Sequence, residues 1–443
     1  MPDLLKLHPS GKHHLPNPRG LHSVGYIDIM TDGDPNTGTF LRLYYPCVED
    51  HQELHNRWPL WMQEDKYISG IITFLKSMAD QWPSWAANKE YKFFGTMRPM
   101  MKSAPRSIAK SILRNQIGNV YIPIVDNASI KETRDGRKWP IVVFSHGIGC
   151  SRFMYSQVCY DIASNGFIVA ATEHRDGSGC MSQYYGTSYM NGINTSTYSN
   201  RWVYHSRCPE SGSGNRFQDE YTFRNKQVHQ RSKEVSRTLD VLLDLNDGKD
   251  IGNIFQKYKT SKPESGIVNL QQFENKMDIS SPVIVGQSFG GATTVLALIE
   301  DERFKIGVAQ DAWLFPLKDE DISVNDTVPI LCINTESFLS PDNLGKMSQL
   351  KTYDGNGAER KFCYIKGSVH QNQLDLPFVL RNKTMKKMFG SHSETDPEKV
   401  MSLNNKLTIQ FIEKKLGRKP NLEINDEIAK LAELVHPGLG IDD

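Results

Sequence analysis

Two short runs in which apolar and polar residues alternate lie near the start of the chain. They cover residues 24–30 and 40–45, and the turn-rich sequence TDGDPNTGT lies between them. Alternation with a period of two is typical of strands, and a connection rich in Gly, Asp and Asn favours a reversal of the chain. We therefore predict an antiparallel hairpin over this segment.

From about Trp139 onward, continuous apolar runs alternate with helical patterns. The runs lie at 141–144 and 167–171 and again at Val283, Ile306, Ile330 and Phe362. Helical spacing follows at 154–162, over a long stretch from about 219 to 245, and in a last helix that carries Leu403, Leu407, Phe411 and Ile412. Crossover helices bury both faces of a parallel sheet, so its strands are apolar throughout. This order predicts an α/β fold with a mostly parallel central sheet and helices on both faces.

Two segments interrupt this pattern and are interpreted as insertions. Residues 50–135 are irregular apart from one helical spacing, formed by Ile68, Ile71, Phe74, Leu75 and Met78. Residues 176–218 are rich in Gly, Ser, Asn and Tyr and have no periodicity, which is typical of a functional lid or a mobile loop. We expect a single domain over residues 1–443, with both insertions and a C-terminal tail from about 417 to 443.

Composition narrows the class of protein. The net charge of the 443 residues is +1, so no global field attracts nucleic acid. No apolar run approaches 18 residues, and Met1–Gly20 lacks the apolar core of a secretory signal. The seven cysteines form no C-x-x-C pair, which favours free thiols in a reducing compartment. These two observations together predict a cytoplasmic protein. No metal or nucleotide motif is present, so we expect neither cofactor nor metal.

The segment Gly286-Gln-Ser288-Phe-Gly290 matches the motif G-x-S-x-G. An apolar run precedes it and a helical pattern follows. In the α/β-hydrolase fold this strand-to-helix turn is so tight that side chains at the two glycines would collide with neighbouring backbone. The motif predicts Ser288 as a nucleophile at the positive end of a helix. The alternative is a glycine-rich turn that only packs a helix closely against the sheet.

A serine hydroxyl needs a general base, and in this fold the acid and then the histidine follow the serine along the chain. His370 lies in a loop just after the apolar run 362–365, where a base is needed. His392 lies in the polar segment SHSETDPE, which favours a solvated surface residue. We therefore predict that His370 is the base.

Two carboxylates compete for the role of the acid. Asp311 ends the first strand after the nucleophile helix, and Glu336 ends the next one. Position along the chain favours Asp311 but leaves Glu336 open. Either residue could instead cap a helix or pair with an arginine.

An oxyanion hole needs two preorganised backbone N–H donors. The residue after the nucleophile, Phe289, supplies one of them. The loop His146-Gly-Ile148-Gly follows an earlier strand, and Ile148 is the expected second donor. We assign His146 a structural role in bracing this loop.

Six motifs together resemble the platelet-activating factor acetylhydrolases, in the branch that contains the plasma enzyme (lipoprotein-associated phospholipase A2) and the intracellular type II enzyme. They are FSHGIG, GFIVAATEHRD, RNKQVHQR, GQSFGGAT, DAWLFPL and IKGSVHQN, and the similarity runs from about residue 22 to 416. The resemblance implies Ca²⁺-independent hydrolysis of the short or oxidised sn-2 acyl ester of phospholipids. It maps the triad onto Ser288, Asp311 and His370, and so decides against Glu336. It maps the oxyanion donors onto Ile148 and Phe289.

The chain departs from the family pattern at two places. The nucleophile motif usually carries His where this chain has Gln287, which bears on substrate preference more than on catalysis. The segment 176–218 is longer than is usual in the family, so the resemblance does not determine which residues form the rim of the pocket. Alternative functions are a neutral-lipid carboxylesterase or an acyltransferase with the same triad, or a non-catalytic lipid-binding relative.

Residues 103–117 predict an amphipathic helix with Ser103 as N-cap and Pro105 in its first turn. One face carries the basic residues Arg106, Lys110 and Arg114, and the other carries Ile108, Ala109 and Ile112. Such a pattern is typical of helices that lie on a membrane surface. The alternative is a solvated helix face.

A second apolar group follows His370 closely and would lie near the mouth of the active site. Its members are Leu374, Leu376, Phe378, Val379 and Leu380. We predict that this group and the basic helix dock the protein on a phospholipid surface. The alternative for 374–380 is ordinary core.

Overall fold

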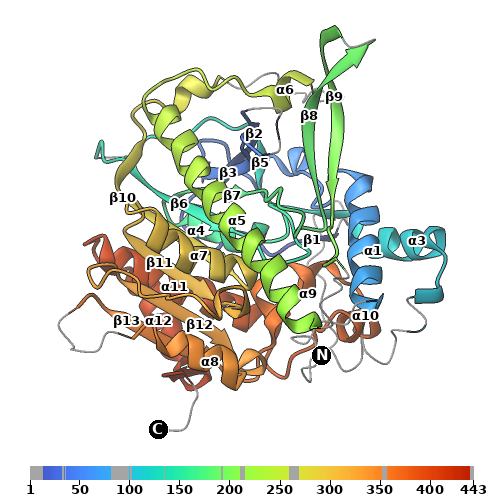
Figure 1. Cartoon of the computed structure of the whole chain (residues 1–443). Coiled ribbons are helices and arrows are strands. Elements are labelled where there is room, and N and C mark those ends of the chain that lie inside the picture. The colour runs from blue at the N-terminus through green and yellow to red at the C-terminus, as the bar shows by residue number, and fades with distance from the viewer. Residues whose placement is uncertain are drawn as a thin grey trace.

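A large mixed sheet organises the computed structural model of the chain (Figure 1). The structure describes residues 13–31, 34, 36–80, 99, 102–133, 135–190, 193–209, 215–258, 269–351 and 357–439. Within them, ten strands pair in the order β14-β13-β12-β11-β10-β6-β7-β3-β2-β5. Their bounds are β2 Val24–Met30, β3 Phe40–Pro46, β5 Val125–Asp126, β6 Trp139–Ser145, β7 Ile168–Thr172, β10 Met277–Gln287, β11 Ile306–Gln310, β12 Ile330–Thr335, β13 Arg360–Ile365 and β14 Val435–Pro437.

Parallel strands form the centre of this sheet. From β7 through β6, β10, β11 and β12 to β13, every neighbouring pair is parallel. β2 and β3 pair with each other in antiparallel fashion, as the alternating runs predict, and β3 continues antiparallel onto β7. The predicted mostly parallel sheet is confirmed. Its carboxyl edge gathers the loops in which an α/β protein builds its site.

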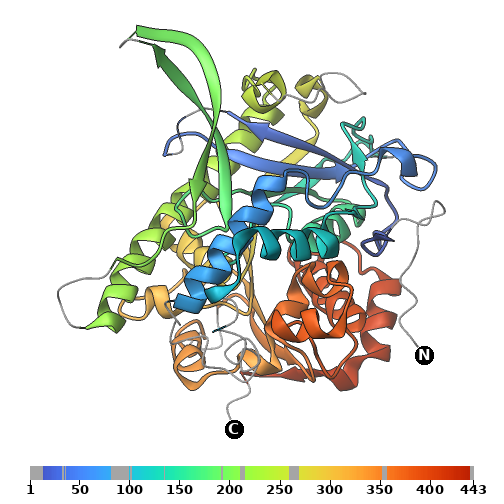
Figure 2. The ribbon, with the colours of Figure 1, turned by 90° about the vertical axis from the view of Figure 1, so that its right-hand side faces the viewer.

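Helices cover both faces of the sheet (Figure 2). The main ones are α4 Ser156–Ser164 and α11 Pro397–Lys415 on one face, and α5 Arg216–Asn246 and α7 Phe289–Glu300 on the other. Along β6, Val142 and Phe144 belong to the first apolar cluster, and Ile141 and Val143 belong to the second. Because both faces are buried, the central strands are apolar throughout.

The segment 50–135 contributes more to the fold than an irregular insertion. It holds α1 Asp65–Asp80 and α3 Arg106–Ile117, which lie side by side (Figure 1). The helical spacing from Ile68 to Met78 is confirmed by α1. The same segment also supplies β5, which pairs with β2 at the edge of the main sheet. Residues 81–98, 100 and 101 lie outside the described part of the chain.

The prediction of an aperiodic loop over 176–218 is wrong. β8 Met181–Met190 and β9 Ile193–Tyr204 form a long antiparallel hairpin that projects from the body (Figure 1). Tyr and Thr, which are frequent here, favour strands. Where both faces of a ribbon are polar, hydrophobicity does not alternate, so the strands leave no signal of period two.

The C-terminal segment, expected to be a tail, returns to the sheet. It forms α12 Leu422–Lys430 and then β14, which pairs antiparallel with β13. Because strands from both ends of the chain belong to one sheet, we propose that the described residues form a single domain. The remaining helices are α6 Ile254–Tyr258, α8 Pro341–Ser348, α9 Leu376–Val379 and α10 Lys383–Met388. No described helix has the length and hydropathy required to cross a bilayer.

Candidate active site

Ser288 lies in the turn between β10 and α7, at the carboxyl edge of the sheet. Its backbone has φ 60° and ψ −118°, a left-handed conformation that is strained for a residue with a side chain. A Cβ on Gly286 would lie 2.1 Å from the carbonyl oxygen of Gly290, and a Cβ on Gly290 would lie 2.0 Å from that of Ser145. Any side chain at either position would therefore collide with backbone, which confirms the predicted requirement for glycine at both. The turn holds Ser288 at the N-terminus of α7, where the helix dipole is positive.

His370 and Asp311 meet at the ends of β13 and β11. The Nδ1 atom of His370 lies 2.9 Å from Oδ2 of Asp311. The Asp311 carboxylate is fully buried and also accepts hydrogen bonds from the N–H and the hydroxyl of Thr335, at 2.5 and 2.6 Å. Burial raises the pKa of Asp311 above its ordinary value, and the donors from His370 and Thr335 oppose that shift. The carboxylate is thus in place to orient an imidazole.

Glu336, the alternative acid, lies elsewhere. Its side chain is exposed, and its Oε2 accepts a hydrogen bond from the N–H of Gly367 at 2.5 Å. It therefore caps a turn, which is the structural role weighed for it above. His392 is exposed, as expected.

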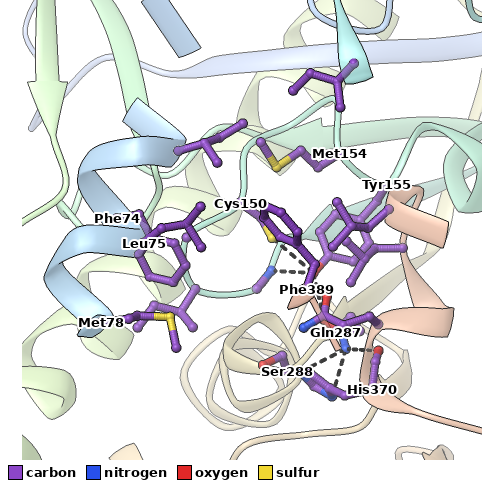
Figure 3. Close-up of a pocket in the computed structure, with 18 of the residues that line it drawn as sticks. Phe74, Leu75, Met78, Cys150, Met154, Tyr155, Gln287, Ser288, His370 and Phe389 are labelled. Carbon is purple, nitrogen blue, oxygen red and sulfur yellow. Dashed lines mark hydrogen bonds between the residues drawn. The ribbon is translucent and has the colours of Figure 1, made fainter. Parts of the chain in front are cut away.

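The imidazole of His370 has two neighbours that sequence reasoning missed. The ring of Phe338 stacks on it with 4.2 Å between centroids and 13° between planes. The amide Nε2 of Gln287 lies 3.2 Å and 3.3 Å from the two ring nitrogens (Figure 3). The Gln287 Oε1 accepts the hydroxyl of Tyr155 at 2.6 Å. Gln287 therefore contacts His370 directly. No sequence signal marks Phe338 or Tyr155 as neighbours of this imidazole.

The loop 146–149 follows β6 and faces Ser288. Its N–H groups at Gly147 and Gly149 donate to the Tyr155 hydroxyl at 3.1 Å and the Ser178 carbonyl at 2.8 Å. Among the described residues, no hydrogen bond is recorded for the N–H of Ile148 or Phe289. These are the two donors that the sequence predicts for an oxyanion hole, and they remain available for a ligand.

An apolar cavity opens beside Ser288 and His370 (Figure 3). Its apolar side chains are Trp61, Ile71, Phe74, Leu75, Met78, Leu113, Ile117, Met154, Trp313, Phe338, Leu374, Leu376, Met388 and Phe389. Residues of α1 and α3 form part of its wall, so the segment 50–135 shapes the cavity. No described residue of 176–218 lines it, although the sequence suggested a lid there.

Burial of Leu374 argues against the expected docking role of this residue, whereas for the half-buried Leu376 and Phe378 that role stays a prediction. Leu374 is 5% exposed and lines the cavity together with Leu376, and Phe378 packs against the core. The segment that carries these residues is tied to the N-terminus of α4, because the Asp375 N–H donates to the carbonyl of Met154. The Asp375 carboxylate strengthens that connection by accepting the N–H groups of Ser156 and Gln157 at 2.9 and 3.0 Å.

Among the described residues, no group of three or more His, Cys, Asp or Glu side chains is arranged to hold a metal ion. The groups gathered beside the cavity are instead a hydroxyl, an imidazole, a carboxylate and two N–H donors. Such a set can perform acyl transfer through a serine.

Comparison with known proteins gives one family and one fold. The family model described as "Platelet-activating factor acetylhydrolase, isoform II" matches residues 7–82 and 78–434. A platelet-activating factor acetylhydrolase of Bos taurus is 33% identical over 95% of this chain and 81% of its own length. That of Canis lupus familiaris is 34% identical over 97% and 83%. A putative phospholipase A2 of Schizosaccharomyces pombe is 24% identical over 72% and 77%.

Among solved structures, a ferulic acid esterase from Streptomyces cinnamoneus has a similar fold. It superimposes with a TM-score of 0.52 over 90% of this chain and 92% of its own, at 15% sequence identity. At this identity the likeness concerns the fold alone.

Proposed function

The chain belongs to the family of platelet-activating factor acetylhydrolases of isoform II, and we propose that it cleaves the sn-2 ester of phospholipids through Ser288, His370 and Asp311. The family makes it a serine ester hydrolase of phospholipids. The residue roles and the preference for short or oxidised sn-2 chains are our proposal. The observation that carries it is the 2.9 Å contact of His370 with buried Asp311, beside a serine held in a strained turn at an apolar cavity.

The mechanism follows from which atoms are committed. His370 Nδ1 donates to Asp311, and we assign Nε2 as the ring nitrogen that accepts the proton of Ser288. The Ser288 oxygen then attacks the sn-2 carbonyl, and the N–H groups of Ile148 and Phe289 stabilise the oxyanion. His370 returns the proton to the departing oxygen of the lyso-phospholipid. A water molecule, deprotonated by His370, then attacks the acyl carbonyl, and His370 passes that proton to the Ser288 oxygen as the carboxylic acid leaves.

We expect full activity in excess EDTA and a rate that falls as the sn-2 chain lengthens. The nucleophile, the base and the oxyanion donors of the proposed mechanism are all groups of the protein, so no Lewis acid takes part. The measurement is hydrolysis of phosphatidylcholines with sn-2 chains of 2 to 16 carbons, with EDTA or with added Ca²⁺. Activity that disappears in EDTA and returns with Ca²⁺ would count against the proposal. Equal rates on neutral-lipid esters would favour a general carboxylesterase.

We also propose that the outer face of α3 docks on a lipid surface. The helix begins after Pro105, and Ser103 is not its N-cap as predicted, because the Ser103 hydroxyl donates to the Pro99 carbonyl. Ile108 and Ile112 are 54% and 52% exposed, while Leu113 is buried against the cavity. One helix thus joins the cavity wall to an exposed apolar patch.

Basic residues flank this patch. Arg106 is exposed and Lys110 is half-buried, whereas Arg114 forms an ion pair with Asp65 of α1. Each cation near an anionic leaflet contributes about 1 kcal/mol. Arg106 and Lys110 are therefore the residues to test, because changing Arg114 would also disturb the contact between α3 and α1.

We expect the double change Arg106→Glu and Lys110→Glu to weaken co-sedimentation with anionic vesicles about tenfold or more. Hydrolysis of vesicle lipid should slow in parallel, and hydrolysis of a water-soluble ester should be unchanged. The matched control is Lys138→Glu with Lys305→Glu, two exposed lysines that precede β6 and β11 at the opposite edge of the sheet. Equal binding of both variants would refute docking through α3.

The free thiols support a proposal about the cellular compartment. All seven cysteines are free in the structure, including the buried pair Cys332 and Cys363 on neighbouring strands. We propose that the protein works in a reducing compartment such as the cytoplasm.

A further inference from the structure

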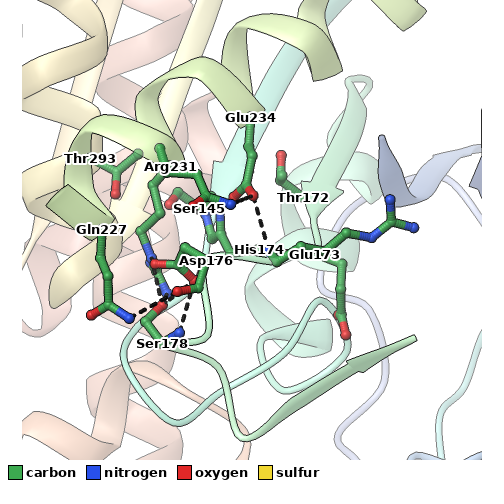
Figure 4. A network of polar contacts seen from close by, with 12 residues as sticks. Ser145, Thr172, Glu173, His174, Asp176, Ser178, Gln227, Arg231, Glu234 and Thr293 are labelled. Atoms are coloured by element: carbon green, nitrogen blue, oxygen red, sulfur yellow. Dashed lines mark hydrogen bonds and ion pairs between the residues drawn. The ribbon is translucent and has the colours of Figure 1, made fainter. Parts of the chain in front are cut away.

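Arg231, in the middle of α5, is a fully buried cation at the centre of a network of polar contacts (Figure 4). Its Nε forms an ion pair with Oδ2 of Asp176 at 3.0 Å. Nε and Nη2 both donate to the hydroxyl of Ser178, at 2.9 and 2.6 Å. Nη1 donates to the carbonyl of His146 at 2.5 Å. A buried charge with this many partners is held in a single geometry.

These contacts hold the loop 146–149 at both of its ends. At the first residue, the His146 carbonyl accepts from Arg231 directly. At the last, the Gly149 N–H donates to the carbonyl of Ser178, whose hydroxyl is bound by the same guanidinium. Ile148, the proposed oxyanion donor, lies between these two anchors.

The second oxyanion donor also contacts Arg231. The guanidinium carbon lies 4.4 Å from the centroid of the Phe289 ring, within the range of a cation–π interaction. Phe289 is the first residue of α7, and its N–H is the other donor. The Arg231 side chain therefore contacts both the loop that carries Ile148 and the ring of Phe289. Helix α5 itself supplies none of the residues that line the cavity.

The imidazoles around Arg231 are held neutral. Burial and the nearby Arg231 lower the pKa of His146 and of His174 well below the ordinary value. The neutral Nε2 of His146 can then accept the N–H of His174 at 3.2 Å, which braces the loop from a third side.

A second serine, histidine and carboxylate meet in this network. Ser145, His174 and Glu234 are joined at 2.8 and 2.6 Å, but their exposed fractions are 0%, 1% and 4%. They do not line the cavity, and no ester can reach them. The arrangement therefore ties β6 and β7 to α5 and is not a second catalytic centre.

We propose that Arg231 is a positioning residue of the oxyanion hole, one that sets the separation of the Ile148 and Phe289 N–H groups by holding the loop and α7 together. This inference rests on the proposed function. Donors must lie 2.7–3.1 Å from the oxyanion to stabilise it, so a small displacement of the loop is costly in rate. Arg231 acts through these two residues and does not touch the substrate.

The test is Arg231→Lys in the full-length protein. Lysine keeps the charge opposite Asp176, but a single ammonium lacks the fork that reaches Ser178 and His146 together. We expect kcat on p-nitrophenyl acetate to fall roughly 10- to 100-fold, with KM changed less than about threefold. Affinity for a short-chain trifluoromethyl ketone, whose tetrahedral adduct needs the oxyanion hole, should fall by a similar factor. The concentration of active sites is titrated with a fluorophosphonate, and kcat is calculated per active site, so unfolded protein does not lower the measured kcat.

The matched control is Arg224→Lys. Arg224 is 7% exposed on the same helix and binds Gln227, and no contact joins it to the loop in the described structure. We expect its kcat and inhibitor affinity to match the wild type. If Arg231→Lys does not fold, the double change Arg231→Met with Asp176→Asn replaces it, because it removes both charges of the pair.

The outcomes separate this inference from the proposed function. If Arg231→Lys behaves like Arg224→Lys in kcat and inhibitor affinity, whatever its melting temperature, Arg231 has no positioning role. If Ser288→Ala, measured in parallel, keeps its activity, then the proposed function itself fails.

Discussion

Replacing Ser288 with alanine is expected to lower kcat by about 10⁶ and to leave the fold intact. The members of a triad act as a unit, so losing the nucleophile removes nearly all catalysis beyond binding and oxyanion stabilisation. The backbone strain at φ 60° is independent of the hydroxyl, and alanine keeps the same Cβ. The measurement is kcat on a short-chain phosphatidylcholine together with the melting temperature.

Ser280→Ala is the matched control. Ser280 lies on the same strand β10, and its exposed hydroxyl donates to Asp278. It should keep both activity and labelling by a fluorophosphonate, whereas Ser288→Ala should lose both. Residual activity of Ser288→Ala within tenfold of the wild type, in protein free of other esterases, would exclude Ser288 as the nucleophile.

The second large effect is expected at the acid. Asp311→Asn should lower kcat by about 10⁴, because an amide facing His370 Nδ1 stabilises the wrong tautomer of the imidazole. Thr335 contributes to this result, since its N–H and hydroxyl already occupy both carboxylate oxygens and orient any side chain at this position. The measurement is kcat on a water-soluble ester, with KM as the check that substrate binding survives.

Glu336→Gln is the control, and it tests the alternative directly. Its amide oxygen can still accept the N–H of Gly367, so we expect a change in kcat of less than about threefold. A larger loss for Glu336→Gln than for Asp311→Asn would place the acid on the later strand. Equal and small losses would remove the carboxylate from the mechanism.

The sequence by itself determined the features that local sterics and periodicity encode. Continuous apolar runs predicted the central strands because both faces of a parallel sheet are buried. The glycines of the serine turn predicted its position, since a Cβ at either one meets backbone at about 2 Å. Both signals can be recognised in a short stretch of sequence, although the backbone that a Cβ on Gly290 would meet belongs to Ser145 on β6.

The choice between two candidate acids needed more than the local pattern. Asp311 and Glu336 both end strands, and position along the chain favoured Asp311 without excluding Glu336. The resemblance to a family favoured Asp311, and the structure brings only that carboxylate to His370. The physical reason is burial. Asp311, at the end of β11, faces the buried imidazole, whereas Glu336, after β12, lies in a solvent-exposed turn.

Burial of apolar segments was likewise decided by distant partners. Leu374 and Leu376 look the same in sequence as Ile108 and Ile112, yet the first pair lines the cavity and Ile108 and Ile112 are half exposed. The strands of the hairpin β8–β9 pair with each other and not with the ten-stranded sheet, and their sequence left no periodic signal.

Tertiary structure alone assigned roles to residues that lie far from the motif in sequence. The cavity wall comes from α1 and α3, more than 170 residues before Ser288, and the contacts of Arg231 join α5 to the oxyanion loop. An arginine inside a helical pattern predicts a solvated face, because exposure is the rule for charged side chains. Only the tertiary packing brings Asp176, Ser178 and the His146 carbonyl around Arg231, and that packing depends on contacts that no local pattern encodes.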